Sequence, residues 1–114
     1  MTAPAKSSRR RAAPATGGRT EAARTSTDTV EPDQQKVEWA LVVKNLKELA
    51  AYAQAKGVTI CVEPLNRFET DFLNTCEQGL KLIKDVGSKA LKLHLDTFHM
   101  NIEQKNQAAA IKKA

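Results

Sequence analysis

Val58-Thr-Ile-Cys-Val-Glu63 and Leu91-Lys-Leu-His-Leu-Asp96 are two short, largely apolar stretches that each end in a carboxylate. The two carboxylates are separated by thirty-three positions. A strand, a helix and a second parallel strand need about 30 residues, so the spacing predicts one βαβ unit. Parallel strands that end at the same level would bring Glu63 and Asp96 into one space. The pair therefore predicts a metal site or an acid–base site.

The stretches around the two predicted strands have the periodicity of helices. Pro32-Asp33 opens a helical pattern that runs to Lys56, and Gly57 follows as the residue that ends it. Thr75-Cys-Glu-Gln78 has the form of a capping box and opens a second helix, which ends at Gly87. A third helix is predicted at 107–114. Alternation of helices and strands predicts a parallel sheet and an α/β fold.

Each predicted strand is followed by a further segment, and the first predicted helix has one apolar face. Its apolar stripe is expected to contain Val42, Leu46, Leu49 and Ala53. The segments Pro64–Glu69 and Thr97–Glu103 are predicted to be polar loops that carry the site.

Side-chain alternation puts the polar residues of both strands on one face. These residues are Thr59, Cys61, Glu63, Lys92, His94 and Asp96. An open α/β sheet favours apolar residues on both faces, whereas the strands of a (β/α)₈ barrel carry their site at their C-terminal ends. We therefore expect an α/β fold in which 32–114 is a fragment of a (β/α)₈ TIM barrel. A full barrel takes about 250 residues, so the fragment would supply about two of the eight βα units.

Residues 1–31 are expected to form a separate, disordered basic tail rich in Ala, Thr and Arg. The first thirty residues hold six basic and two acidic side chains, which accounts for +4 of the chain's net charge of +5. A segment with so little to bury cannot offset its ordering entropy. A solvated extension, an organelle leader and a nucleic-acid or lipid contact through Arg9-Arg10-Arg11 remain open. Nucleic-acid binding is disfavoured because no aromatic residues interleave the arginines.

Two further features bear on location. No apolar run approaches the roughly 18 residues of a membrane span, and no apolar core follows the N-terminal basic residues as in a secretory signal. Cys61 and Cys76 do not indicate a disulfide framework or a thiolate metal site. We expect a cytoplasmic protein without membrane association.

Two motifs carry a resemblance to a known family. Glu63-Pro-Leu-Asn-Arg-Phe-Glu-Thr70 and Leu95-Asp-Thr-Phe-His-Met-Asn-Ile-Glu103 resemble the sugar-phosphate isomerase/epimerase family with the xylose-isomerase-like TIM barrel. Within it, the chain is most similar to the ketose 3-epimerases of the D-tagatose/D-psicose 3-epimerase type. The similarity spans roughly 36–112, and the two motifs are long and ungapped.

The resemblance implies roles for four residues. Glu63 would bind a divalent metal and act as one of two acid–base carboxylates, and Asp96 would be a second metal ligand. Glu69 and His99 would hydrogen-bond the sugar near its reacting hydroxyl groups. In the family the metal is Mn²⁺ or Mg²⁺, and sometimes Co²⁺, held by two Glu, one Asp and one His. This chain would carry two of those four ligands.

Neighbouring side chains receive structural interpretations. Arg67 is expected to pair with a nearby carboxylate, His94 to fill the barrel interior, and Trp39 to pack against the helices. Phe68 and Phe98 are either loop anchors or an apolar wall against the sugar.

The leading hypothesis is a metal-dependent sugar isomerase that epimerises a ketose at C3 through an enediolate, in the form of a truncated chain that is inactive alone. Its active site would be incomplete, so whether the chain itself is an enzyme stays open. The alternative is a non-catalytic remnant or interaction module that self-associates as a homo-oligomer through open sheet edges. A nucleic-acid-associated protein acting through the arginine tail is the third and weakest hypothesis.

Overall fold

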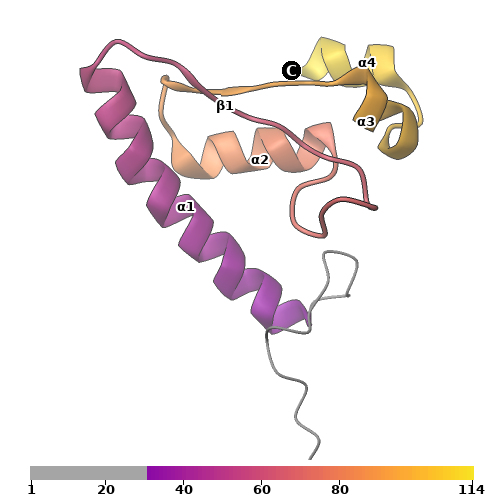
Figure 1. Ribbon diagram of the computed structural model, residues 1–114, viewed down its shortest axis with the longest axis horizontal. Coiled ribbons are helices and arrows are strands. Elements are labelled where there is room, and N and C mark those ends of the chain that lie inside the picture. The colour runs from indigo at the N-terminus through magenta and orange to yellow at the C-terminus, as the bar shows by residue number, and fades with distance from the viewer. Residues whose placement is uncertain (1–30) are drawn as a thin grey trace, which may run out of the picture.

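The computed structural model describes residues 31–114. They form four helices and two strands in the order α1 (Pro32–Ala55), β1 (Ile60–Val62), α2 (Cys76–Val86), β2 (Leu91–Leu93), α3 (Thr97–Glu103) and α4 (Gln107–Lys113) (Figure 1). The predicted disordered tail and its arginine run lie outside the described residues, apart from Glu31 at the tail's boundary. Within 31–114, no helix combines the length and the apolar character that crossing a membrane would require.

The first helix begins and ends where the sequence predicts. Pro32 occupies its first turn, where a missing N–H costs nothing, and Gly57 follows its end with a φ of 66°. The expected apolar stripe is wrong at one position. Leu49 is half exposed, whereas Ala50 is fully buried. The buried face of α1 is therefore centred nearer to Leu46 and Ala50 than the predicted stripe is.

The two strands pair in parallel, and the crossover between them is α2, which confirms the predicted βαβ unit. Cys61 lies opposite Lys92, and both are exposed, so the polar residues of the two strands share one face as predicted. Each strand is only three residues long. The first predicted strand, Val58–Glu63, is therefore too long at both ends. The second, Leu91–Asp96, is too long at its C-terminal end.

The aliphatic face of this sheet packs on α1 and α2. Figure 1 shows both helices on the same side of the strands, with α3 and α4 at one end. The main core cluster contains the buried residues Ala50, Leu73, Leu82, Val86 and Leu91, with Ile60 and Val62 packed against them. Trp39 belongs to the same cluster, and its indole N–H donates to Asp85 at 2.8 Å, which agrees with the packing role expected for it.

The capping box at the start of α2 is confirmed. The Thr75 hydroxyl accepts from the Gln78 N–H at 3.2 Å, and the Gln78 side chain accepts from the Thr75 N–H at 3.0 Å. Gly87 closes the helix in the left-handed conformation. Gly79 lies where α2 crosses the sheet, and a Cβ there would stand 2.5 Å from the Leu93 Cδ1. The glycine therefore permits the close approach of α2 to β2.

The segment after the second strand differs from the expectation. Thr97–Glu103, predicted as a polar loop, is the helix α3. Asp96 caps it, and Met100 buries itself against Cys76 and Ala110 in a second core cluster. The polar appearance of the segment therefore comes from the exposed side of a short helix with one buried face. Pro64–Glu69 is a loop as predicted, and α4 occupies the position of the predicted last helix.

Candidate metal and sugar site

Three residues from the two predicted loops and strand ends meet at one point. Glu63 directly follows β1, Asp96 is the residue before α3, and His99 lies in the first turn of that helix. One potential ligand atom from each lies within 4.8 Å of those of the other two. Glu63 is partly exposed and His99 is buried. The structure therefore brings Glu63 and Asp96 together as the sequence predicts, and adds His99 to them.

The register of the strands changes how Glu63 and Asp96 come together. Val62 pairs with Leu93, so Glu63 lies level with His94, and Asp96 is two residues further along its chain. The expectation that both carboxylates end their strands at the same level is wrong, because both strands end at the Val62–Leu93 pair, and Glu63 comes one residue after β1 whereas Asp96 comes three residues after β2. His94 accordingly touches the site: its Nδ1 is 3.6 Å from the Glu63 Oε2.

Asp96 has a second task in addition to facing Glu63. Its backbone is extended at the N-cap of α3, and its Oδ1 accepts a hydrogen bond from the Phe98 N–H at 2.8 Å. An aspartate at this position satisfies one of the free N–H groups of the first turn. The cap fixes the carboxylate in place beside Glu63 and orients the helix that carries His99.

A buried hydrogen-bond network holds His99 and Glu69. The His99 Nδ1 accepts from the Asn66 main-chain N–H at 3.1 Å and lies 2.9 Å from the Asn66 side-chain nitrogen. That same nitrogen donates to the Glu69 Oε2 at 3.1 Å, which is itself 3.3 Å from the His99 Nδ1. Asn66 is 3% exposed, so it links two predicted sugar-contact residues from inside the protein.

Arg67 and Glu103 tie the first loop to the end of α3. The Arg67 main-chain N–H, Nε and Nη2 donate to the Glu103 carboxylate at 2.7, 2.9 and 3.1 Å. These bonds lower the pKa of Glu103 from its ordinary value, first through the side-chain hydrogen bond from Arg67, and they raise the pKa of Arg67. The ion pair expected for Arg67 is confirmed, and it keeps the Glu69 loop against the His99 helix.

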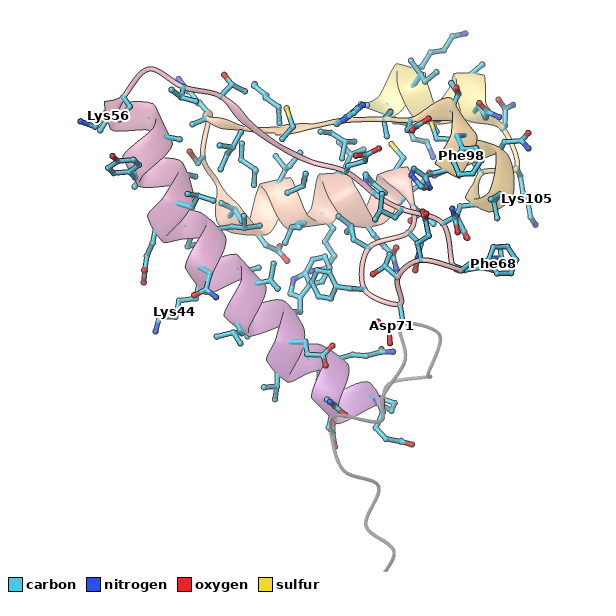
Figure 2. The ribbon with its side chains drawn as sticks, viewed as in Figure 1. Lys44, Lys56, Phe68, Asp71, Phe98 and Lys105 are labelled. Atoms are coloured by element: carbon cyan, nitrogen blue, oxygen red, sulfur yellow. The ribbon has the colours of Figure 1, made fainter. Side chains whose placement is uncertain are left out.

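The two phenylalanines of the motifs are exposed on this end of the protein. Figure 2 labels Phe68 on the loop and Phe98 on α3. They are 68% and 62% exposed, so neither anchors its segment in the core. The Phe98 ring meets the His99 ring edge to face, with centroids 5.1 Å apart. The structure therefore excludes the interpretation of Phe68 and Phe98 as loop anchors buried in the core.

Two residues of the site were not identified as such from the sequence. His94 was assigned to the barrel interior, yet in residues 31–114 its side chain is 58% exposed and faces Glu63. The alternation that puts it on the same face as Glu63 and Asp96 could have indicated this contact. Asn66 gave no signal, because nothing in a loop sequence shows that its amide and main-chain N–H will face a histidine.

The donor set fits a divalent metal with a preference for oxygen. Glu63 and Asp96 provide two carboxylates, and among residues 31–114 the third member of the group is the imidazole of His99 rather than a thiolate. Carboxylate ligands suit Mn²⁺ and Mg²⁺ better than the softer metals that thiolates select. Two protein carboxylates are also few for a tight site, since Mg²⁺ and similar ions usually fill several positions with water or substrate.

The sequence matches the family model described as the xylose isomerase-like TIM barrel over residues 15–114. The chain is 48% identical over 75 residues to the D-psicose 3-epimerase of Enterocloster bolteae, covering 66% of this chain and 25% of that enzyme. It is 48% identical over 77 residues to the L-ribulose 3-epimerase of Mesorhizobium japonicum, covering 68% and 26%.

A solved structure agrees with these matches. The D-psicose 3-epimerase from Clostridium cellulolyticum H10, determined with D-tagatose, superposes with a TM-score of 0.70 at 39% identity, over 78% of this chain and 30% of that one. The chain thus spans about a quarter of the length of the curated relatives that it matches. The expected fold, a part of a (β/α)₈ barrel of this family, is confirmed.

Proposed function

The chain belongs to the xylose isomerase-like TIM barrel family, and from this premise we propose that 36–112 supplies part of the active site of a metal-dependent ketose 3-epimerase. The observation that carries the proposal is the meeting of Glu63, Asp96 and His99 within 4.8 Å at the C-terminal end of two parallel strands. That edge is where barrels of this architecture perform their chemistry. We also propose 32–114 as the barrel portion, 1–31 as a separate tail, and a cytoplasmic location.

Glu63 and Asp96 would hold the divalent metal, with Mn²⁺ or Mg²⁺ preferred and Co²⁺ as a third candidate. When bound, such an ion supplies Lewis-acid stabilisation of negative charge on the sugar oxygens. Ligand atoms of the two carboxylates lie within 4.8 Å of each other, and like charges this close favour a bound cation electrostatically.

Epimerisation at C3 of a ketose removes the proton next to the carbonyl and returns one to the opposite face through an enediolate. Two carboxylates, one on each face of the sugar, are suited to these proton transfers. Glu63 would be one of them. Its side chain is 32% exposed, which leaves room for a sugar above it. The second would come from outside residues 31–114.

Glu69 and His99 would bind the sugar hydroxyl groups. Both belong to the network around Asn66, which fixes their positions relative to Glu63 before a ligand arrives. The names of the relatives point to ketoses of five or six carbons as the substrate class, as in D-psicose and L-ribulose. With one acid–base carboxylate and two metal ligands, residues 31–114 alone would not turn over substrate.

A chimeric enzyme tests this proposal. Residues 36–112 would replace the matching segment of the Enterocloster bolteae enzyme, and the product of D-fructose with Mn²⁺ would be analysed for D-psicose. We expect activity in the chimera and its loss, by a factor of at least about a hundred, in the same chimera with Glu63→Gln. A folded but inactive chimera, or one indifferent to Glu63→Gln, would refute the assignment. The isolated chain, assayed alongside, is expected to give no product.

The second candidate function is a self-associating module without catalysis, and one observation favours it. Residues 31–114 form a two-stranded sheet, so both of its edges lack a neighbouring strand there. A groove of about 600 Å³ runs along the free edge of β2, between Leu91 and Leu93 of the strand and Leu80 and Ile83 of α2. Such an edge is a template for pairing with another chain.

Sedimentation of the purified chain distinguishes this second candidate. Association through the edge would give dimers or larger species that dissociate when Leu93→Lys places a charge in the groove. Leu49→Lys, at an exposed position on α1, is the matched control. A folded monomer at all accessible concentrations would exclude assembly through the edge.

A further inference from the structure

The tautomer of His99 decides what this residue can offer to the site, and the structure assigns it. A main-chain N–H can only donate a hydrogen bond, and the Asn66 N–H points at the His99 Nδ1 at 3.1 Å. Nδ1 must therefore carry a lone pair. A neutral imidazole has one N–H, so the proton resides on Nε2.

The Asn66 side chain also favours the tautomer with the proton on Nε2. Its Oδ1 accepts from the Phe68 main-chain N–H at 3.0 Å, which fixes which end of the amide is oxygen. The amide nitrogen then faces the His99 Nδ1 at 2.9 Å and places a second donor there. Within residues 31–114, the acceptor near Nδ1 is the Glu69 Oε2, which is further away at 3.3 Å and already receives the amide of Asn66.

The hydrogen bonds at the remote nitrogen of His99 run in the opposite direction to those of a metal-binding histidine. A ligating imidazole usually donates its remote N–H to a carboxylate or carbonyl, which leaves the other nitrogen free to bind the ion. In His99 the remote nitrogen receives N–H groups instead. Its Nε2, 3.9 Å from the Glu63 Oε1, lies beyond hydrogen-bond range of that carboxylate and carries its proton toward the site.

We propose that Asn66 is a positioning residue that holds His99 in the Nε2–H tautomer, so that His99 presents an N–H donor rather than a metal ligand beside Glu63 and Asp96. Of the three residues Glu63, Asp96 and His99, the first two would then be metal ligands and the third a hydrogen-bond donor. The donor is suited to an oxygen of a bound sugar. This inference rests on the proposed function for the identity of that ligand, but the tautomer itself does not.

The tautomer can be measured directly in the chain. The protein has two histidines, so a ¹⁵N-labelled His94→Gln variant leaves the ring nitrogens of His99 alone in long-range ¹H–¹⁵N spectra. At about pH 8 we expect the Nε2–H pattern, because the main-chain N–H of Asn66 donates to Nδ1. An Nδ1–H pattern, a ring protonated on both nitrogens or an averaged mixture would overturn the inference.

A variant and its control test the role of Asn66. Asn66→Asp removes the side-chain donor and puts an acceptor in its place while the main-chain N–H remains, so it is expected to shift only part of the His99 population toward the Nδ1–H tautomer. Asn74→Ala is the control, because Asn74 holds the same loop through the carbonyls of Leu65 and Thr70 without facing His99. An equal shift in both variants would mean that loop packing, not Asn66, sets the tautomer. If Asn66→Asp does not fold, the spectrum recorded with Asn66 in place still tests the assigned tautomer of His99.

Titration with Mn²⁺ separates this inference from the proposed function. We expect His99→Ala to change the Mn²⁺ affinity by less than about threefold, and Glu63→Gln to lower it at least about tenfold. An equal loss in both variants would make His99 a ligand and refute the inference. An Nε2–H tautomer in a chain that binds no Mn²⁺ would count against the metal site and leave the positioning role intact. An Nδ1–H tautomer with Mn²⁺ bound through Glu63 would do the reverse.

Discussion

The Glu103 carboxylate accepts three hydrogen bonds from Arg67, one from its main-chain N–H and two from its guanidinium group, across thirty-six positions of sequence. The Glu103 side chain is 8% exposed, whereas that of Arg67 is 62% exposed. The pair joins the loop that carries Asn66 and Glu69 to the helix that carries His99. Its integrity therefore determines the shape of the site.

This pair predicts a particular dependence of stability on pH. Because Arg67 lowers the pKa of Glu103 in the folded protein, the stabilisation is complete above the unfolded pKa of about 4.3. It is lost as the pH falls through the lower folded value. We expect Glu103→Gln to lower the melting temperature by about 4–8 °C at pH 7, and by progressively less below about pH 4.

Melting curves measured between pH 7 and pH 3 test this. Glu48→Gln, at an exposed position on α1, is the control and should follow the wild type at every pH. A constant difference between the wild type and Glu103→Gln over the whole range would contradict the assignment of the effect to ionised Glu103.

The helix cap formed by Asp96, together with the metal-ligand role proposed for it, predicts that two substitutions there will differ. Asparagine is an equally good helix cap, so Asp96→Asn should preserve α3 while lowering the Mn²⁺ affinity at least about tenfold. Asp96→Ala should lose the metal and also about 1 kcal/mol of stability through the lost cap. Mn²⁺ titration and thermal unfolding of the same samples distinguish these losses. Equal stability of the two variants would show that the cap contributes nothing.

The close crossing of α2 over β2 predicts that Gly79→Ala destabilises the protein, although alanine is the better helix former. The added Cβ would stand 2.5 Å from the Leu93 Cδ1 and 3.3 Å from the Pro64 Cγ. We expect a net loss of about 1 kcal/mol, because overpacking outweighs the gain in propensity. Denaturant unfolding of Gly79→Ala, Leu93→Val and the double variant measures it. The two changes should be less than additive, and strict additivity would contradict the proposed clash.

The capping box predicts a smaller and local effect. Thr75→Ala removes the acceptor for the Gln78 N–H and should cost about 1 kcal/mol. Thr75→Ser keeps the acceptor and should restore most of the loss. Denaturant unfolding of the two variants checks this, and equal destabilisation by serine and alanine would point to lost packing of the methyl group instead.

Local sequence signals predicted the elements well wherever one residue fixes the backbone. Gly57 and Gly87 both adopt the positive φ expected of residues that end helices, and Thr75 forms the predicted cap. The lengths of the strands were not predictable in this way. Val58 and Thr59 have strand-forming side chains, but a strand lasts only as far as its partner pairs with it.

The prediction of α3 as a loop failed for a related reason. Polar residues in Thr97–Glu103 concealed a helix whose burial depends on Met100 meeting Cys76 and Ala110, which come from elsewhere in the chain. Tertiary packing of one face, rather than intrinsic propensity, stabilises most short helices.

The sequence by itself determined the βαβ unit, the family and the three residues Glu63, Asp96 and His99, because these depend on local periodicity and on motifs that are contiguous in the chain. Only the tertiary structure decided how they are used. The register puts His94 rather than Asp96 level with Glu63, and the packing of the loop on α3 turns Asn66 toward His99. Side-chain alternation has a period of two, so it predicts the face on which a residue lies but not a shift of two residues along the strand. Hydrogen-bond direction arises from contacts between segments some thirty positions apart.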